Sequence, residues 1–403
     1  MKYLMILADG IADHPSEALS GKTPLEVSRT PNLDYFAKIG KVGMVRTIPD
    51  RLDLVSHLGL ISLLGYDPRQ HPTGLGPLEA ANLELKLEEN EIAFRMNFIS
   101  ESVGILADAT AGHITTREAK ALVGFLNKKL SSDFVRFFAS HEHQHIAVIK
   151  DARGYEALSA TCTVPESIVG KPIEANLPKG PGEDMIKKLM YDAKSLLVEH
   201  EINQVRVDLG ENPANMIWLW GQGLLPKLPK LSDRMNGITS AMVSTSEYAK
   251  GFARLIGMTV MDVAKNRIYP DYDYEGQAEA MMDLLGEKDF VCVHMNVCEE
   301  ASREGDLKQK VLALEAIDHY VISRIKTFYE SNKDIRILIS PLLVIPHEIK
   351  KAVRESVPFI IAGKNIKPDE IERYNEATAH VSQLKFSEGW KLIEELTSTK
   401  DLG

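Results

Sequence analysis

The chain has 403 residues, 44% of them hydrophobic, and a formal net charge of −10. Chains longer than ~250–300 residues usually form more than one domain, and a negative net charge argues against nucleic acid or an anionic membrane as the main partner. Cys162, Cys292 and Cys298 form neither a metal-binding spacing nor an even disulfide set, so we expect a reducing, cytoplasmic environment.

The apolar N-terminal segment, residues 1–8, is too short for the ~20 residues that a membrane-spanning helix requires. It also lacks the small-residue cleavage site of a signal peptide. We therefore expect a buried strand at this position and no membrane partner.

Strand-like and helix-like patterns alternate along the chain. In chain order we expect a strand at 3–7, helices at 32–38 and 56–64, strands at 91–98 and 102–107, a helix at 115–129, strands at 134–139 and 145–150, a helix at 182–199, a strand at 216–220, a helix at 247–256, strands at 259–263 and 290–296, a helix at 307–330, strands at 336–339 and 358–362, and a helix at 388–396. This alternation is typical of an α/β fold with mainly parallel sheets. Residues 74–77 and 266–271 are candidate linkers.

Two polar residues stand where α/β proteins place their sites. Asp9 directly follows the first expected strand, and ligand sites form at the carboxyl ends of parallel strands, although Asp9-Gly10 could also be a simple turn. Ser56 opens an expected helix, where its hydroxyl could be a nucleophile beside amides that hold a phosphate. The alternative for Ser56 is a simple helix cap.

Several longer motifs then occur in a fixed order. They are Lys-Thr-Pro-Leu-Glu (22–26), Thr-Pro-Asn-Leu-Asp (30–34), Gly-Tyr-Asp-Pro (65–68), Thr-Gly-Leu-Gly-Pro-Leu-Glu-Ala (73–80), Phe-Arg-Met-Asn-Phe (94–98), Ile-Trp-Leu-Trp-Gly (217–221), Val-His (293–294), Gly-Asp (305–306) and Glu-Ala-Ile-Asp (315–318). Together with Asp9-Gly10, this series resembles the archaeal-type, cofactor-independent phosphoglycerate mutases of the alkaline phosphatase superfamily. The resemblance covers nearly the whole chain.

The resemblance implies a doubly wound, phosphatase-like sheet domain built from both chain ends, residues 1–80 and 265–403. A smaller α/β domain, residues 81–264, would be inserted between them. The implied activity is that of a glycolytic isomerase, which interconverts 3-phosphoglycerate and 2-phosphoglycerate through a phosphoserine. Two divalent metals, usually manganese, assist this reaction in the family. The implied partner is therefore a small phosphorylated metabolite.

The resemblance also implies roles for individual residues. Ser56 matches the nucleophile, and Asp9, Ser56 and Glu299 match metal-binding positions. Three residues of the inserted domain, Arg95, Asn97 and Lys250, are candidate contacts to an anionic substrate, and the alternative for them is a side chain that faces water.

Several positions depart from the family pattern. Arg303 stands where a metal-binding histidine is expected, and a guanidinium cannot ligate a metal. Residues 341–346 read Pro-Leu-Leu-Val-Ile-Pro where the family has Gly-Asp-His-Ser-Thr-Pro, so an aspartate and a histidine are lost. Residues 55–57 read Val-Ser-His in place of Gly-Ser-Asp, and Leu75 replaces an arginine. We therefore predict at most one bound metal and little or no metal-dependent mutase activity.

Burying carboxylates without their metal would be costly, so we expect Arg303 to pair with Asp9 or Glu299. Three alternatives remain: an active mutase with a rearranged or single-metal site, a different phosphoryl-transfer chemistry with Ser56 and His57, and an anion-binding or regulatory protein without activity. His347 could be a shifted metal ligand or a surface helix residue.

A histidine-rich segment at 141–145 is a second candidate for metal binding. Strand alternation would place His141, His143 and His145 on one face. The alternative is an ordinary polar strand.

Overall fold

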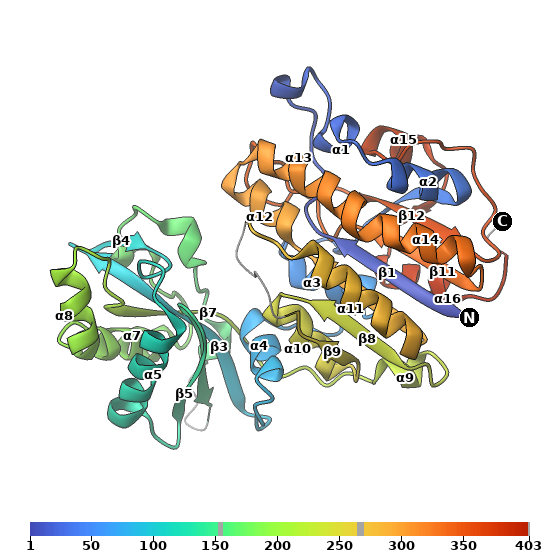
Figure 1. Ribbon diagram of the computed structural model, residues 1–403. Helices are drawn as coiled ribbons and strands as arrows, with labels where there is room; N and C mark the ends of the chain where they lie inside the picture. The colour runs from blue at the N-terminus through green and yellow to red at the C-terminus, as the bar shows by residue number, and fades with distance from the viewer. Residues whose placement is uncertain (152–155, 264–269, 402–403) are drawn as a thin grey trace. The chain divides into compact units, whose positions relative to one another are not determined.

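The computed structural model describes residues 1–151, 156–263 and 270–401 (Figure 1). The chain forms two compact units, residues 1–71 with 228–403, and residues 72–227. The boundaries differ from the expected 80/81 and 264/265 because β8 (Ser240–Ser244) pairs with β10 (Phe290–Met295) in the first unit, and β9 (Thr259–Met261) pairs with β8.

The two expected linkers have different outcomes. Residues 266–269 of the second one lie outside the described residues. The first one is not a linker, because Gly74 precedes helix α4 (Leu75–Asn82) as its N-cap residue and Gly76 and Pro77 lie inside that helix.

The first unit contains an eight-stranded sheet with the strand order β13-β2-β12-β11-β1-β10-β8-β9. The remaining strands are β1 (Lys2–Ala8), β2 (Lys41–Val45), β11 (Ile335–Ser340), β12 (Val357–Gly363) and β13 (Lys385–Phe386). The pairs are parallel, except that β12 runs antiparallel to both β11 and β2. The expected mainly parallel sheet is therefore confirmed for this unit.

Both faces of this sheet are buried, as the continuous apolar sequence of β1 requires. Leu4 and Ile6 face a core that includes side chains of α2, α11 and α13, while Met5 and Leu7 are buried on the opposite face. In Figure 1, α11, α13 and α14 pass in front of β1.

The helices of this unit are α1 (Pro24–Val27), α2 (Pro31–Ile39), α3 (Ser56–Leu63), α9 (Leu231–Arg234), α10 (Glu247–Leu255), α11 (Tyr274–Glu287), α12 (Val297–Glu304), α13 (Leu307–Ala316), α14 (Ser323–Ser331), α15 (Glu376–Val381) and α16 (Leu392–Thr397).

The expected long helix at 307–330 is divided by a π-helical turn, Ile317–Ile322, between α13 and α14. This turn carries Asp318, a buried residue. Its Oδ1 accepts hydrogen bonds from the backbone amides of Asn32 at 3.1 Å and Leu33 at 2.7 Å. A side chain that is distant in sequence thus caps α2.

The second unit has a five-stranded sheet of β3 (Glu91–Ser102), β4 (Ile105–Asp108), β5 (Val135–His141), β6 (Gln144–Lys150) and β7 (Met216–Gly223). All these pairs are antiparallel, so the expectation of parallel sheets was wrong here. For two of these pairs the reason is local, because two-residue turns join β3 to β4 and β5 to β6, and such turns connect only antiparallel strands.

Four further helices, besides α4, belong to the second unit. They are α5 (Thr116–Leu130), α6 (Ile173–Asn176), α7 (Glu183–Leu197) and α8 (Glu201–Asp208). Thr115 and Glu118 form a capping box at the start of α5. Across the described part of the chain, every helix is too short or too polar to cross a membrane.

Candidate functional site

The candidate site lies in the first unit, at the carboxyl ends of three adjacent strands. Asp9 follows β1, Glu299 lies in the first turn of α12 after β10, and residues 341–346 follow β11. Ser56, the first residue of α3, adds its hydroxyl to this group. Neighbouring parallel strands therefore bring together residues that are more than 200 positions apart in sequence.

One carboxylate oxygen, Oε1 of Glu299, is the centre of the site. It accepts a hydrogen bond from Ser56 Oγ at 2.7 Å and two more from Arg303, through Nε at 2.9 Å and Nη2 at 2.7 Å. Arg303 lies one helical turn after Glu299 on α12, which gives the two side chains a shared face. The structure thus pairs Arg303 with Glu299, one of its two expected partners.

The apolar segment 341–346 contacts Asp9 through its backbone. Oδ1 of Asp9, a fully buried residue, accepts hydrogen bonds from the amides of Gly10 at 2.9 Å, Leu342 at 3.2 Å and Leu343 at 3.3 Å. The two leucines that replace an expected aspartate and histidine therefore bind Asp9 with their N–H groups.

The carboxyl groups of Asp9 and Glu299 have pKa shifts of opposite direction. Oδ2 of Asp9 is buried, and among the described residues no N–H or neighbouring hydroxyl donates to it. Burial, together with the charge of Glu299 and a hydrogen bond to it, raises the pKa of Asp9 well above its usual value. Burial would also raise the pKa of Glu299, but Arg303 and the hydrogen bonds from Asp9, Ser56 and Arg303 lower it overall. Of the two carboxyl groups, Asp9 is therefore the one that more readily holds a proton.

Two aromatic residues line the same region. The Tyr248 hydroxyl lies 3.4 Å from Nε2 of His294, and Nδ1 of His294 lies 3.0 Å from Ser244 Oγ. Burial lowers the pKa of His294 to about 4, and burial with the nearby charge of Glu299 raises that of Tyr248 well above its usual value. Both side chains are therefore neutral at physiological pH. Sequence reasoning missed Tyr248, which no motif marked.

The serine has a carboxylate partner. The hydroxyl of Ser56 donates to Glu299, and the ring of His57 lies 6.3 Å from that of Tyr248. The pairing of Ser56 with His57 as a base stays a prediction, and the geometry favours Glu299 as the acceptor.

The donor set does not fit two divalent cations. Within the described ranges, no three or more histidine, cysteine, aspartate or glutamate side chains are grouped so that they could hold a metal. Ser56 interacts with two carboxyl groups, that of Asp9, whose pKa is raised well above its usual value, and that of Glu299, which already binds a guanidinium. Hard cations need several free, ionised oxygen ligands.

One alternative placed His347 on the surface, and this alternative was wrong. It is 6% exposed, and its Nδ1 lies 3.1 Å from Oδ2 of Asp13, so its ring is committed to another carboxylate.

The histidine-rich segment forms a hairpin, so the expectation of a single continuous strand was wrong. His141 ends β5, residues 142–143 form the turn, and His145 lies in β6. His145 is buried, where its Nδ1 accepts the backbone N–H of Ser140 at 3.0 Å.

The three residues expected to contact the substrate bind other side chains of this protein. Arg95 forms an ion pair with Glu79 at 3.0 Å. Asn97 is fully buried, and its Oδ1 accepts a hydrogen bond from Trp220 Nε1 at 3.1 Å. Lys250 was expected in the inserted domain, residues 81–264, but it belongs to the first unit. It pairs there with Glu247 at 2.7 Å and with Asp262 at 3.0 Å. Their binding roles stay predictions.

Comparison with known proteins agrees with this architecture. The sequence model of the 2,3-bisphosphoglycerate-independent phosphoglycerate mutase family matches residues 37–203. Enzymes of this name from Methanothrix thermoacetophila and Methanothermobacter thermautotrophicus are each 38% identical, over 98% of this chain and over 99% and 96% of their own lengths.

Two solved structures have a similar fold. One is a protein from Pyrococcus horikoshii, with a TM-score of 0.82, 23% identity, and coverage of 100% of this chain and 99% of the other. The second is the cofactor-independent phosphoglycerate mutase of Thermoplasma acidophilum, with a TM-score of 0.63, 23% identity, and coverage of 98% and 99%. From its long alignments at 38% identity, the chain belongs to the 2,3-bisphosphoglycerate-independent phosphoglycerate mutase family.

Proposed function

We propose that this protein is a phosphoglycerate mutase homologue in which an internal arginine has taken the place of catalytic metal. It would have little or no metal-dependent mutase activity. The observation that carries the proposal is the set of three hydrogen bonds on Oε1 of Glu299, two from Arg303 and one from Ser56.

The guanidinium excludes a cation by charge and by position. Its two nitrogens lie 2.7 and 2.9 Å from the one oxygen of Glu299 that also contacts Ser56. A dication bridging Glu299 and Ser56 would meet a positive charge within a few ångströms, and this repulsion would not be offset by aspartate or histidine ligands from 342–343. Protonated Asp9, ionised Glu299 and Arg303 leave the site with no net charge to attract a metal.

The same contacts keep Ser56 a neutral hydroxyl. A nucleophilic serine needs a metal or a base to take its proton. Glu299 accepts a hydrogen bond from Ser56, but the nearby Arg303 lowers the pKa of Glu299 overall despite its burial, which makes it a weak base. Phosphoryl transfer through Ser56 would therefore lack its usual activation.

The expected ligand remains a small phosphorylated metabolite of glycolysis, in a reducing cytoplasm. Ser56 opens α3, and the first amides of a helix favour anions, which supports binding of a phosphate group without its transfer. Three free cysteines fit such a compartment.

Metal analysis and an activity assay test the proposal. Purified protein is saturated with Mn²⁺, dialysed and analysed for metal, then assayed with 3-phosphoglycerate beside a Ser56→Ala control. We expect less than one equivalent of manganese and no conversion above that of the control. Two retained equivalents, or Ser56-dependent turnover above ~1 s⁻¹, the low end of ordinary enzymes, would overturn the proposal.

A further inference from the structure

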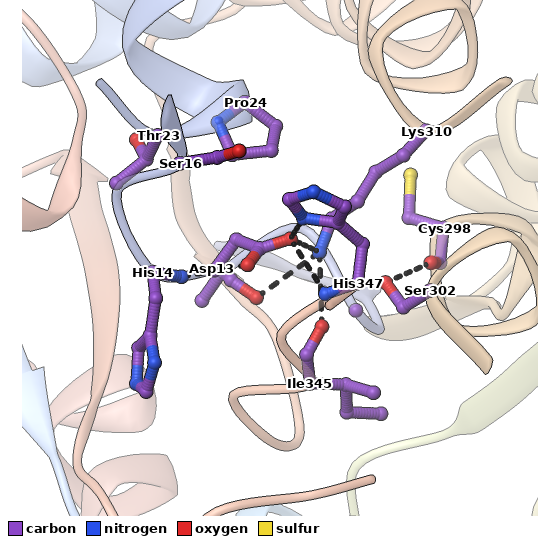
Figure 2. Close-up of polar contacts among 12 residues, drawn as sticks. Asp13, His14, Ser16, Thr23, Pro24, Cys298, Ser302, Lys310, Ile345 and His347 are labelled. Atoms are coloured by element: carbon purple, nitrogen blue, oxygen red, sulfur yellow. Dashed lines mark hydrogen bonds and ion pairs between the residues drawn. The ribbon is translucent and has the colours of Figure 1, made fainter. Parts of the chain in front are cut away.

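A second group of charged side chains is buried close to the site. It consists of Asp13, Lys310 and His347, here named the Lys310 cluster (Figure 2). The side chains of Asp13 and Lys310 are 0% exposed and that of His347 is 7% exposed. Burying a lysine costs free energy unless each N–H of its ammonium group donates a hydrogen bond. The acceptors of these hydrogen bonds therefore indicate which segments the lysine holds in place.

The ammonium group of Lys310 joins two separate segments of the chain. It donates to Oδ2 of Asp13 at 2.6 Å and to the carbonyl oxygens of Ala12 at 3.3 Å and Ile345 at 3.1 Å. Three donors thus meet three acceptors. Figure 2 shows the Lys310 ammonium and the His347 ring meeting at the Asp13 carboxylate, with Ile345 below them.

His347 makes a second connection between the same segments. Its backbone amide lies 3.2 Å from Oδ2 of Asp13, and its Nδ1 lies 3.1 Å from the same atom. The amide of Ile345 donates to the carbonyl of Ala12 at 3.4 Å. The loop after β1 and the segment after β11 are therefore bound to each other at residues 12–13 and 345–347.

These connections begin a few residues beyond the contacts of Asp9. Asp13 is four positions after Asp9, and Ile345 is two positions after Leu343, whose amide binds Asp9. Fixing 12–13 against 345–347 therefore fixes the register in which 342–343 meet the carboxylate of Asp9.

We propose that Lys310 is a positioning residue, which through Asp13 and Ile345 holds residues 342–347 where the amides of Leu342 and Leu343 bind Asp9. That these amides close a former metal site rests on the proposed function above. The positioning itself is measured in metal-free protein, so it can fail or succeed independently of any result with manganese.

Hydrogen exchange of the full-length protein tests the proposal. The variants are Lys310→Met and the neutral double variant Lys310→Met/Asp13→Asn, and the control is Lys308→Met, an exposed position on the same helix. The double variant carries the test because it leaves no unpaired charge. The amides of residues 342–345 and 347 report on the segment, since residue 346 is a proline, and those of β12 serve as the internal reference.

In the double variant we expect the amides of residues 342–345 and 347 to exchange at least about tenfold faster than in the wild type, with β12 unchanged. That is the effect of losing roughly one net hydrogen bond of local stability. Lys308→Met should match the wild type. A role limited to the ion pair predicts wild-type exchange in the double variant, and this result would overturn the proposal. General unfolding of the neutral variant would also contradict it, because the proposed effect is local.

Discussion

Replacing the internal cation tests the electrostatic account of the site most directly. In Arg303→Met, Glu299 loses two hydrogen bonds and its positive partner, yet remains 8% exposed beside Asp9. Hydrogen bonds to charged groups contribute about 1.5–3 kcal/mol when buried, but the Arg303 side chain is 42% exposed, so solvent screening reduces the figure. We expect a loss of about 1–2 kcal/mol near neutral pH.

The effect should depend on pH in a defined direction. Without Arg303, the pKa of Glu299 in the folded variant should rise above its unfolded value of about 4.3, since burial and Asp9 both favour the protonated form. A group with a raised folded pKa contributes stability below its unfolded pKa and loses it as pH rises. The variant should therefore differ most from the wild type at about pH 7 and least at about pH 4–5.

Urea denaturation at these two pH values measures the difference. Arg303→Lys, which keeps the charge but loses the paired nitrogens, should fall between the wild type and Arg303→Met. Arg324→Met, at an exposed position on α14, is the matched control and should change little. Millimolar Mn²⁺ should raise the midpoint of Arg303→Met and not that of the wild type. An equal loss at both pH values, or none at neutral pH, would refute the electrostatic reasoning.

Three further predictions follow from individual contacts. The triple variant Arg303→His/Leu342→Asp/Leu343→His restores three ligands and should bind Mn²⁺ measurably by calorimetry. Burial, with the charge of nearby His143, lowers the pKa of His145 to about 3, so protonation of this residue in the unfolded state destabilises the native state as pH falls below ~6.5. His145→Gln should therefore lose about 2 kcal/mol less stability than the wild type between pH ~6.5 and ~5 in chemical denaturation. Asp318→Ala leaves the first amides of α2 uncapped and should cost about 2–3 kcal/mol in urea denaturation.

Each of these predictions has a result that contradicts it. No heat of manganese binding by the triple variant would mean that more than the lost ligands prevents metal binding. If His145→Gln and the wild type lose the same stability as the pH falls from ~6.5 to ~5, this histidine is not buried in its neutral form. Asp283→Ala, at an exposed position on α11, is the control for Asp318→Ala, and equal losses in the two would remove the capping argument.

The sequence by itself determined the family, the first unit's sheet and the residues that meet at its edge. Continuous apolar segments such as 3–8 predict strands buried on both faces, and the residues that follow such strands must gather at one edge. The placement of Asp9 and Glu299 together follows from that rule. That residues 303, 342 and 343 carry no metal-ligating side chain is also visible in the residue types alone.

Tertiary structure decided which contacts residues 342 and 343 make. Leu342 and Leu343 bind Asp9 through amides, and every residue other than proline has such a group, so no residue type could indicate this contact. Lys310 meets Asp13 across 297 positions, and local periodicity does not report pairs so far apart. The same holds for β8, which pairs with β10 and so moved the domain boundary. Long-range pairing depends on how the whole chain packs, which is why these features required the folded protein.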